Sequence, residues 1–201
     1  MTVGIIDYGV GNIGSLINMF YRLEIEASVI TGPAEVRNHE HVLLPGVGAF
    51  DIAMSQLQRT GFDDAVRSHA DAGRHLLGIC LGMQLLLDSS EEGQLPGFGL
   101  IPGTSRKFAA TSHIRVPHMS WSQVRPERNH PLVDDLPENH RFYFVHSYRV
   151  VCDSASTVLA TTEYGERYPS MISSGSVVGA QFHPEKSHRF GMRMLKAWAA
   201  L

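Results

Sequence analysis

Apolar residues along the chain occur in short, β-branched runs that are separated by longer segments of helical periodicity. In the first part of the chain these runs lie at residues 3–6, 27–30, 42–44 and 75–79. Between them, residues 13–23 and 50–72 carry apolar side chains at steps of three and four, which predicts amphipathic helices. Strands that alternate with helices indicate an α/β fold with a mostly parallel central sheet and helices on both faces.

The pattern changes after about Lys107, where helical periodicity gives way to further short runs. These runs lie at residues 141–151, 156–161, 170–173 and 177–182. They predict a mixed or antiparallel section added to the parallel sheet. Residues 187–201 then predict a final amphipathic helix with Ser187 as its N-cap. No repeat or linker interrupts the chain, so residues 1–201 are expected to form a single domain.

Composition and charge narrow the class of protein and its partners. The 201 residues are 43% hydrophobic and 18% charged, which is typical of a soluble globular protein. The net charge is -3 and no Lys/Arg block occurs, which argues against a nucleic-acid partner or an anionic membrane surface. Neither a secretion signal nor a run of the roughly 20 apolar residues of a membrane span occurs. With only Cys80 and Cys152, the chain fits a reducing compartment, and we expect the cytoplasm.

Candidate chemistry begins with Cys80, in the segment GICLG at residues 78–82. The segment joins the run 75–79 to a helical pattern, as a nucleophile elbow does. Glycines flank the nucleophile in such a turn because side chains would collide with the strand and the helix. The helix N-terminus would favour the thiolate, and the carboxyl edge of an open α/β sheet is where ligands bind. The alternative is a small buried cysteine before an ordinary turn.

A general base for this thiol is offered by His183, in the segment GAQFHPE at residues 179–185. The histidine ends an apolar run, and Pro184 biases it towards an extended backbone. Two residues on, Glu185 could orient the imidazole and stabilise its charged form. By itself His183 could be an ordinary hydrogen-bonded histidine, but with Cys80 it completes a Cys-His-Glu triad.

A third segment, LLPGVGAF at residues 43–50, is a strand that ends in two glycines before a helix. Backbone without side chains can bring N–H groups to a ligand, which suits an oxyanion hole. A simple strand-to-helix turn is the alternative.

Other motifs point to cofactors or metals less well. Residues 9–14 fit the dinucleotide pattern G-x-G-x-x-G, but Thr31 and Gly32 stand where that pattern requires an acidic residue. His183 and His188 lack the H-E-x-x-H spacing, and no Cys/His pair has zinc spacing. We therefore expect neither a cofactor nor a metal site, and we interpret Cys152 as a packed cysteine.

Together the segments 78–84 (GICLGMQ) and 179–185 (GAQFHPE) resemble the class I, triad-type glutamine amidotransferases. Further segments resemble the glutaminase subunits of imidazole glycerol phosphate synthase, namely residues 6–12, 45–50, 116–119, 143–148 and 184–187. The resemblance runs from residue 3 to the C-terminus. It implies a flavodoxin-like class I amidotransferase fold and a heterodimer with a (β/α)8-barrel synthase.

The resemblance also implies a role for each matching residue. Cys80 would attack the carboxamide of glutamine, His183 would transfer protons, and Glu185 would hold His183. The oxyanion hole would come from backbone near Val47, Gly48 and Leu81. Glutamine would be bound by Gly48, Gln84, His146 and Ser147. The partner would face Asn12, Trp121, Tyr143 and Lys186. Ammonia would pass to the synthase, which makes imidazole glycerol phosphate and an aminoimidazole carboxamide ribotide in histidine biosynthesis.

One segment departs from this family. Where the family usually reads PHMGWN, residues 117–122 read PHMSWS, with Ser120 and Ser122 in a region expected near the partner. This departure leaves open a paralogous subunit that feeds ammonia to another synthase, for example in sugar amidination for surface polysaccharide. A Cys/His peptidase or γ-glutamyl hydrolase, and a flavodoxin-like binding module with an inert cysteine, are the remaining alternatives.

Overall fold

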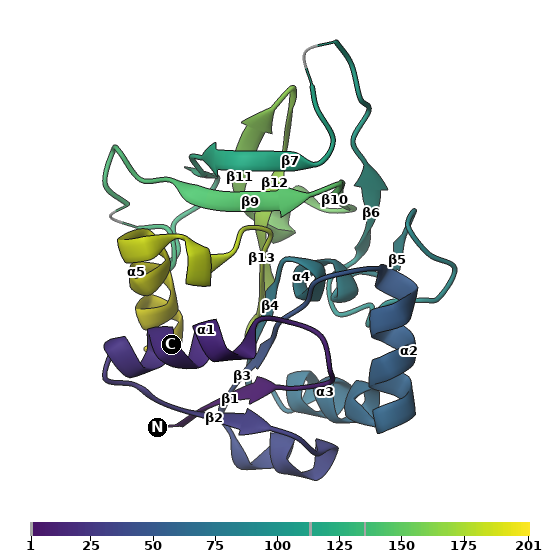
Figure 1. The fold of residues 1–201 in the computed structure, drawn as a ribbon, viewed down its shortest axis with the longest axis vertical. Coiled ribbons are helices and arrows are strands. Elements are labelled where there is room, and N and C mark those ends of the chain that lie inside the picture. Colours follow the sequence, from purple (N-terminus) through teal and green to yellow (C-terminus); the bar gives the residue numbers. More distant parts are fainter. Residues whose placement is uncertain (1, 113, 135) are drawn as a thin grey trace.

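A computed structural model describes residues 2–112, 114–134 and 136–201. Its main element is an eight-stranded sheet in the order β2-β1-β3-β4-β13-β12-β11-β8 (Figure 1). The parallel part consists of β2 (Glu26–Ile30), β1 (Thr2–Ile6), β3 (His41–Leu44), β4 (His75–Ile79) and β13 (Val177–Ala180). The antiparallel extension consists of β12 (Glu166–Ser174), β11 (Val158–Tyr164) and β8 (Arg125–Pro126).

Helices cover both faces of the parallel part. On one face lie α1 (Ile13–Arg22) and α5 (His188–Ala199), and on the other lie α2 (Phe50–Thr60), α3 (Phe62–Asp71) and the short α4 (Leu81–Leu85) (Figure 1). Successive strand residues serve opposite cores: Leu43 packs towards α1 and α5, whereas Val42 and Leu44 pack towards α2 and α3. Because both faces are covered, the central strands β1, β3 and β4 are apolar over most of their length, which is why they read as short apolar runs in the sequence.

Two smaller sheets lie beyond the carboxyl ends of the parallel strands (Figure 1). One pairs β7 (His118–Ser122) with β9 (Phe142–His146), and the other contains β10 (Tyr148–Cys152), β6 (Gly103–Lys107) and β5 (Ser89–Ser90). Three short 3-10 helices, at Pro33–Asn38, Ala155–Thr157 and Pro184–Lys186, complete the described elements. The added section predicted from the sequence is therefore confirmed.

Three predicted elements differ in detail from the structure. The helical segment 50–72 is divided at Gly61, whose φ of 76° ends α2 and turns the chain into α3. The run 141–151 breaks at Ser147, so that β9 and β10 belong to different sheets. Ser187 precedes α5 but its side chain does not cap the helix, because its hydroxyl bonds elsewhere. Among the described residues, no helix has the length and apolar character needed to cross a membrane.

Candidate active site

Cys80 occupies a strained turn between β4 and α4. Its φ and ψ are 55° and -109°, a conformation that non-glycine residues rarely adopt. A Cβ on Gly78 would lie 2.6 Å from the carbonyl oxygen of Gly82, and one on Gly82 would lie 2.0 Å from that of Leu44. The turn therefore closes only with glycine at both flanking positions, which is the reason predicted from the sequence.

His183 is held beside this turn by main-chain contacts to β9. Its N–H donates to the carbonyl of Tyr143 at 2.9 Å. The hydroxyl of Ser187 donates to the His183 carbonyl at 2.6 Å and accepts from the Tyr143 N–H at 3.0 Å. A single buried hydroxyl thus links the histidine loop to the edge of β9, which explains why Ser187 does not cap α5.

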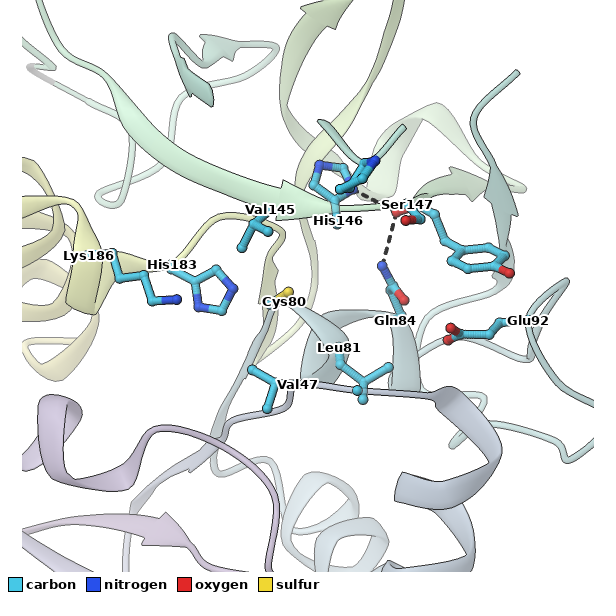
Figure 2. Close-up of a pocket in the computed structure, with 13 residues that line it drawn as sticks. Val47, Cys80, Leu81, Gln84, Glu92, Val145, His146, Ser147, His183 and Lys186 are labelled. Carbon is cyan, nitrogen blue, oxygen red and sulfur yellow. Dashed lines mark hydrogen bonds between the residues drawn. The ribbon is translucent and has the colours of Figure 1, made fainter. Parts of the chain in front are cut away.

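Glu185 is hydrogen-bonded to the imidazole of His183. Its Oε1 lies 2.7 Å from Nδ1 of His183, and both side chains are only 3% exposed. Burial by itself would lower the pKa of His183, but hydrogen bonds to Cys80 and Glu185, together with the negative charges of these groups, raise it to about 9. Figure 2 shows the imidazole turned towards Cys80. His183 is therefore suited to hold a proton beside Cys80 at neutral pH.

A cavity of about 420 Å³ opens over Cys80 and His183. Every residue predicted for the oxyanion hole or for glutamine binding lines it, namely Val47, Gly48, Leu81, Gln84, His146 and Ser147. These residues come from the β3–α2 loop, from α4, and from the junction of β9 and β10 (Figure 2). The cavity therefore lies between the parallel sheet and the added section.

The loop after β3 has the conformation expected of a ligand-binding turn. Gly48 has a φ of 98°, which favours glycine, and a Cβ there would meet no atom within 4 Å. Tyr8 fixes the start of the loop, since its hydroxyl donates to the Pro45 carbonyl at 2.8 Å, and burial raises the pKa of this phenol. Opposite the loop, Leu81 begins α4, where the first N–H groups have no partner within the helix.

The polar side chains of the cavity differ in which of their atoms remain available to bind a ligand. The amide nitrogen of Gln84 donates to the Tyr148 carbonyl at 3.0 Å and to Oε1 of Gln181 at 3.1 Å, so its own oxygen remains for a ligand. The ring nitrogens of His146 are both bonded, to the Tyr148 carbonyl at 2.7 Å and to the Tyr168 hydroxyl at 3.2 Å. His146 can therefore offer a ligand only its main chain and its ring carbons.

Sequence reasoning missed Glu92, Pro117, Val145 and Tyr148, which also line the cavity. Glu92 is the most consequential of these. One of its carboxylate oxygens accepts the Phe50 N–H at 3.0 Å, and the other is free to meet a positively charged group in the cavity. Glu92 lies in a polar loop without periodicity or motif, so only its pairing with α2 locates it at the site.

The residues expected to face a partner form one cluster and one outlier. The rings of Trp121 and Tyr143 meet edge to face with centroids 5.7 Å apart, and Nζ of Lys186 lies 5.8 Å from the centre of the Tyr143 ring. Trp121 is 41% exposed. Asn12 is also exposed, but its side chain caps α1 by accepting the Ser15 N–H at 3.3 Å.

Motifs set aside in the sequence have structural roles. Gly9 and Gly11 lie in the loop from β1 to α1, where a Cβ on Gly11 would lie 3.1 Å from the ring of Pro45, and Gly14 lies in the first turn of α1. Cys152 is a free, half-buried thiol in β10. Within the described ranges, no group of three or more His, Cys, Asp or Glu side chains could hold a metal ion.

Comparison with known proteins agrees with this geometry. Residues 4–200 match the family described as glutamine amidotransferase class-I. The chain belongs to this family. It is 46% identical over 198 residues to the imidazole glycerol phosphate synthase subunit HisH of Symbiobacterium thermophilum, covering 98% of this chain and 92% of that one. It is 43% identical over 195 residues to subunit HisH 2 of Methanococcus maripaludis, covering 96% of both. Within the amidotransferases, the chain is therefore a member of the HisH group.

Solved structures support the amidotransferase fold at much lower identity. The structure of PurLQS from Thermotoga maritima superposes with a TM-score of 0.75 at 18% identity, over 99% of this chain and 97% of that one. A glutamine amidotransferase from the same organism gives a TM-score of 0.65 at 17% identity, over 100% of this chain and 83% of that one. At such identities the likeness concerns the fold alone.

Proposed function

We propose that this HisH-group chain, as one glutaminase domain spanning residues 1–201, hydrolyses glutamine at the cavity over Cys80. The observation that carries the proposal is that Cys80 and His183, with Glu185 bonded behind His183, line a cavity that also bears Glu92 and Gln84. The carboxylate of Glu92 and the free oxygen of Gln84 suit the ammonium group of an amino acid. The hydroxyl of Ser147, which bonds to no other described residue, suits its carboxylate.

In the first step, the Cys80 thiolate attacks the side-chain amide carbon of glutamine. The negative charge that develops on the amide oxygen is stabilised by backbone N–H groups near Val47, Gly48 and Leu81. His183 gives its proton to the departing nitrogen, so ammonia leaves and a glutamyl thioester remains on Cys80.

In the second step, neutral His183 takes a proton from water, and the resulting hydroxide attacks the thioester carbon. The carbon–sulfur bond breaks, the new carboxyl group gives its proton to solvent, glutamate leaves, and the Cys80 thiolate and the His183 imidazolium are restored. Glu185 holds the ring in one orientation through both steps, because its carboxylate stays hydrogen-bonded to Nδ1.

As a HisH subunit of imidazole glycerol phosphate synthase, the chain supplies the released ammonia for histidine biosynthesis. We propose that it does so as a heterodimer with a (β/α)8 synthase in the cytoplasm. The surface formed by Trp121, Tyr143 and Lys186 would face that partner, together with Asn12. This surface adjoins the reaction site, since Lys186 also lines the cavity.

The test is glutamate release from glutamine by the chain mixed with a histidine-pathway barrel synthase, with and without the ribonucleotide substrate of the synthase. We expect ligand-dependent release that Cys80→Ala abolishes, whereas Cys152→Ala serves as the matched control and retains activity. Persistence of glutamate release in the Cys80→Ala variant would exclude the triad. If the wild-type chain neither formed a complex with this synthase nor responded to its ribonucleotide substrate, a different synthase would be the acceptor of the ammonia.

A further inference from the structure

Gln181 lies between the cavity wall and the nucleophile, and no step of the proposed reaction has used it. Its side chain is fully buried, two residues before His183, and its amide nitrogen lies 3.9 Å from Sγ of Cys80. Gln84, on α4, lies on the other side of this amide. The direction of the two amides decides whether Cys80 faces a hydrogen-bond donor or an acceptor.

The backbone carbonyl of Tyr148 fixes that direction, because a carbonyl can only accept. The Gln84 atom that meets it at 3.0 Å must therefore be the NH₂ group. The same NH₂ meets Gln181 at 3.1 Å, so Gln181 must present its oxygen there. The NH₂ group of Gln181 is then left to point at the sulfur.

The same carbonyl also fixes the donor and acceptor directions in a second chain of hydrogen bonds, the His146–Tyr168–His118 branch, which runs towards β7. Nδ1 of His146 must donate to Tyr148, so its Nε2 accepts from the hydroxyl of Tyr168. The Tyr168 oxygen then accepts from Nδ1 of His118 at 3.0 Å, which leaves Nε2 of His118 as an acceptor. The hydroxyls of Ser120 and Ser122 lie 2.8 and 3.1 Å from this nitrogen.

Both histidines must be neutral for this pattern to hold, and their surroundings keep them so. Burial lowers the pKa of His118 to about 4 and that of His146 to about 3. The Tyr148 carbonyl is thus fixed by two donors, His146 and Gln84. The serines that distinguish residues 117–122 from the usual family sequence complete the far end of the branch.

We propose that Gln181 directs an amide N–H at the Cys80 sulfur and stabilises its thiolate, and that Gln84 and the His146–Tyr168–His118 branch are positioning residues for this donor. The inference rests on the proposed function for its biological meaning, since the thiolate is the form that attacks glutamine. A donor beside the sulfur favours the thiolate over the thiol, and it equally favours the thiolate as the leaving group when the thioester breaks.

The experiment measures the reactivity of Cys80 towards iodoacetamide as a function of pH, without glutamine. A Cys152→Ser background leaves Cys80 as the only thiol of the chain. The rate of alkylation rises as the thiolate forms, so the midpoint of the rise reports how strongly the site favours the thiolate. In Gln181→Met, which keeps the length of the side chain but lacks the donor, we expect the midpoint to rise by about one pH unit.

Two further variants make the test specific. Gln181→Glu should raise the midpoint more than Gln181→Met, because it replaces the donor with a carboxylate oxygen beside the sulfur. Gln84→Met should raise it less, and the double variant should equal Gln181→Met alone, since Gln84 affects the sulfur only through Gln181. Circular dichroism and thermal unfolding check that each variant is folded.

An unchanged midpoint in folded Gln181→Met, or additive shifts in the double variant, would overturn the inference. Because no glutamine is present, the result does not depend on the proposed activity. The alkylation experiment can therefore disprove the role of Gln181 without bearing on glutamine hydrolysis, and the glutamate-release experiment can disprove glutamine hydrolysis without bearing on Gln181.

Discussion

Histidines are buried at both ends of the parallel sheet, but His118 and His146 at the carboxyl end differ from His41 at the amino end in their hydrogen bonding. At the carboxyl end, all ring nitrogens of His118 and His146 have hydrogen-bond partners. At the amino end, His41 is 2% exposed and neither of its ring nitrogens has a partner among the described residues. Its ring stacks on that of His75, with centroids 4.4 Å apart, and meets Trp198 edge to face at 5.3 Å.

Burial lowers the pKa of His41 to about 4, as it does for His118, so both histidines are neutral at pH 7. The histidine beside it adds to the effect at His41. The two sites nevertheless differ in the free energy that burial of the ring costs, since a buried polar atom without a hydrogen-bond partner costs about 1–3 kcal/mol. Hydrogen bonds therefore position the rings of His118 and His146, whereas only ring packing positions the ring of His41.

The largest loss of stability is expected at the carboxyl end of the sheet, where the backbones of β3 and α4 are in direct contact. In Gly82→Ala the added methyl would lie 2.0 Å from the Leu44 carbonyl, so β3 and α4 must separate. We expect destabilisation by about 3 kcal/mol or more and loss of glutamine hydrolysis. Gly14→Ala is the matched control: its methyl meets nothing within 4 Å, so stability should be unchanged or rise by about 0.5–1 kcal/mol. Urea unfolding measures both, and equal losses would refute the steric explanation.

The second effect concerns the bonded triad. Glu185→Gln replaces the carboxylate that holds Nδ1 of His183, so the imidazolium loses its charge partner. We expect glutamine turnover to fall by about two to four orders of magnitude, with little change in the KM for glutamine. The midpoint of Cys80 alkylation should also move to higher pH, because a less basic His183 stabilises the thiolate less. A normal rate in this variant would show that Glu185 only packs beside the site.

The third prediction compares the stability of the two ends by replacing a buried histidine with phenylalanine at each of them. His118→Phe removes one hydrogen-bond partner from the hydroxyls of Tyr168, Ser120 and Ser122, and should cost about 1–3 kcal/mol. His41→Phe keeps the ring contacts, removes two unbonded nitrogens, and should be neutral or stabilising. Thermal unfolding at neutral pH distinguishes them, and an equal loss in both variants would contradict the contrast between the two ends.

Acid should destabilise the wild-type chain through His41. Because the pKa of folded His41 lies below the ordinary value of about 6.5, the unfolded chain takes up this proton first as the pH falls. The wild-type chain therefore loses stability between about pH 6.5 and about pH 4, by about 1.4 kcal/mol for each unit of pKa difference. His41→Phe should remove this share of the acid sensitivity. An unchanged slope of stability against pH would show that His41 is not responsible.

The smallest effect is expected from the paired serines. Nε2 of His118 needs only one donor, and two hydroxyls lie within reach of it. Ser120→Ala and Ser122→Ala should therefore each cost less than about 0.5 kcal/mol, whereas the double variant should cost about 1 kcal/mol or more. Additive losses, measured by urea unfolding, would indicate that each serine serves a separate partner.

Several elements were predictable because a local rule fixes them. The runs at 3–6 and 75–79 lie inside β1 and β4, since strands covered on both faces must be apolar throughout. The division of residues 50–72 at Gly61 was missed, because a helical pattern continues across the glycine and only the chain path shows its φ of 76°. The break of the run 141–151 at Ser147 was missed for a similar reason, since both halves read as strand.

Sequence alone was enough to predict the fold class and to propose Cys80, His183 and Glu185 as a triad, because the glycine elbow and the segment at 179–185 each encode a local backbone geometry. Only the folded chain reveals that Glu92 belongs to the cavity wall and how the polar groups of that wall are oriented. Glu92 reaches it through the N–H of Phe50, and the Tyr148 carbonyl orients Gln84 and His146 from another sheet. Such contacts join residues far apart along the chain, and hydrogen bonding depends on atoms a few ångströms apart, which no periodicity or spacing in one sequence records.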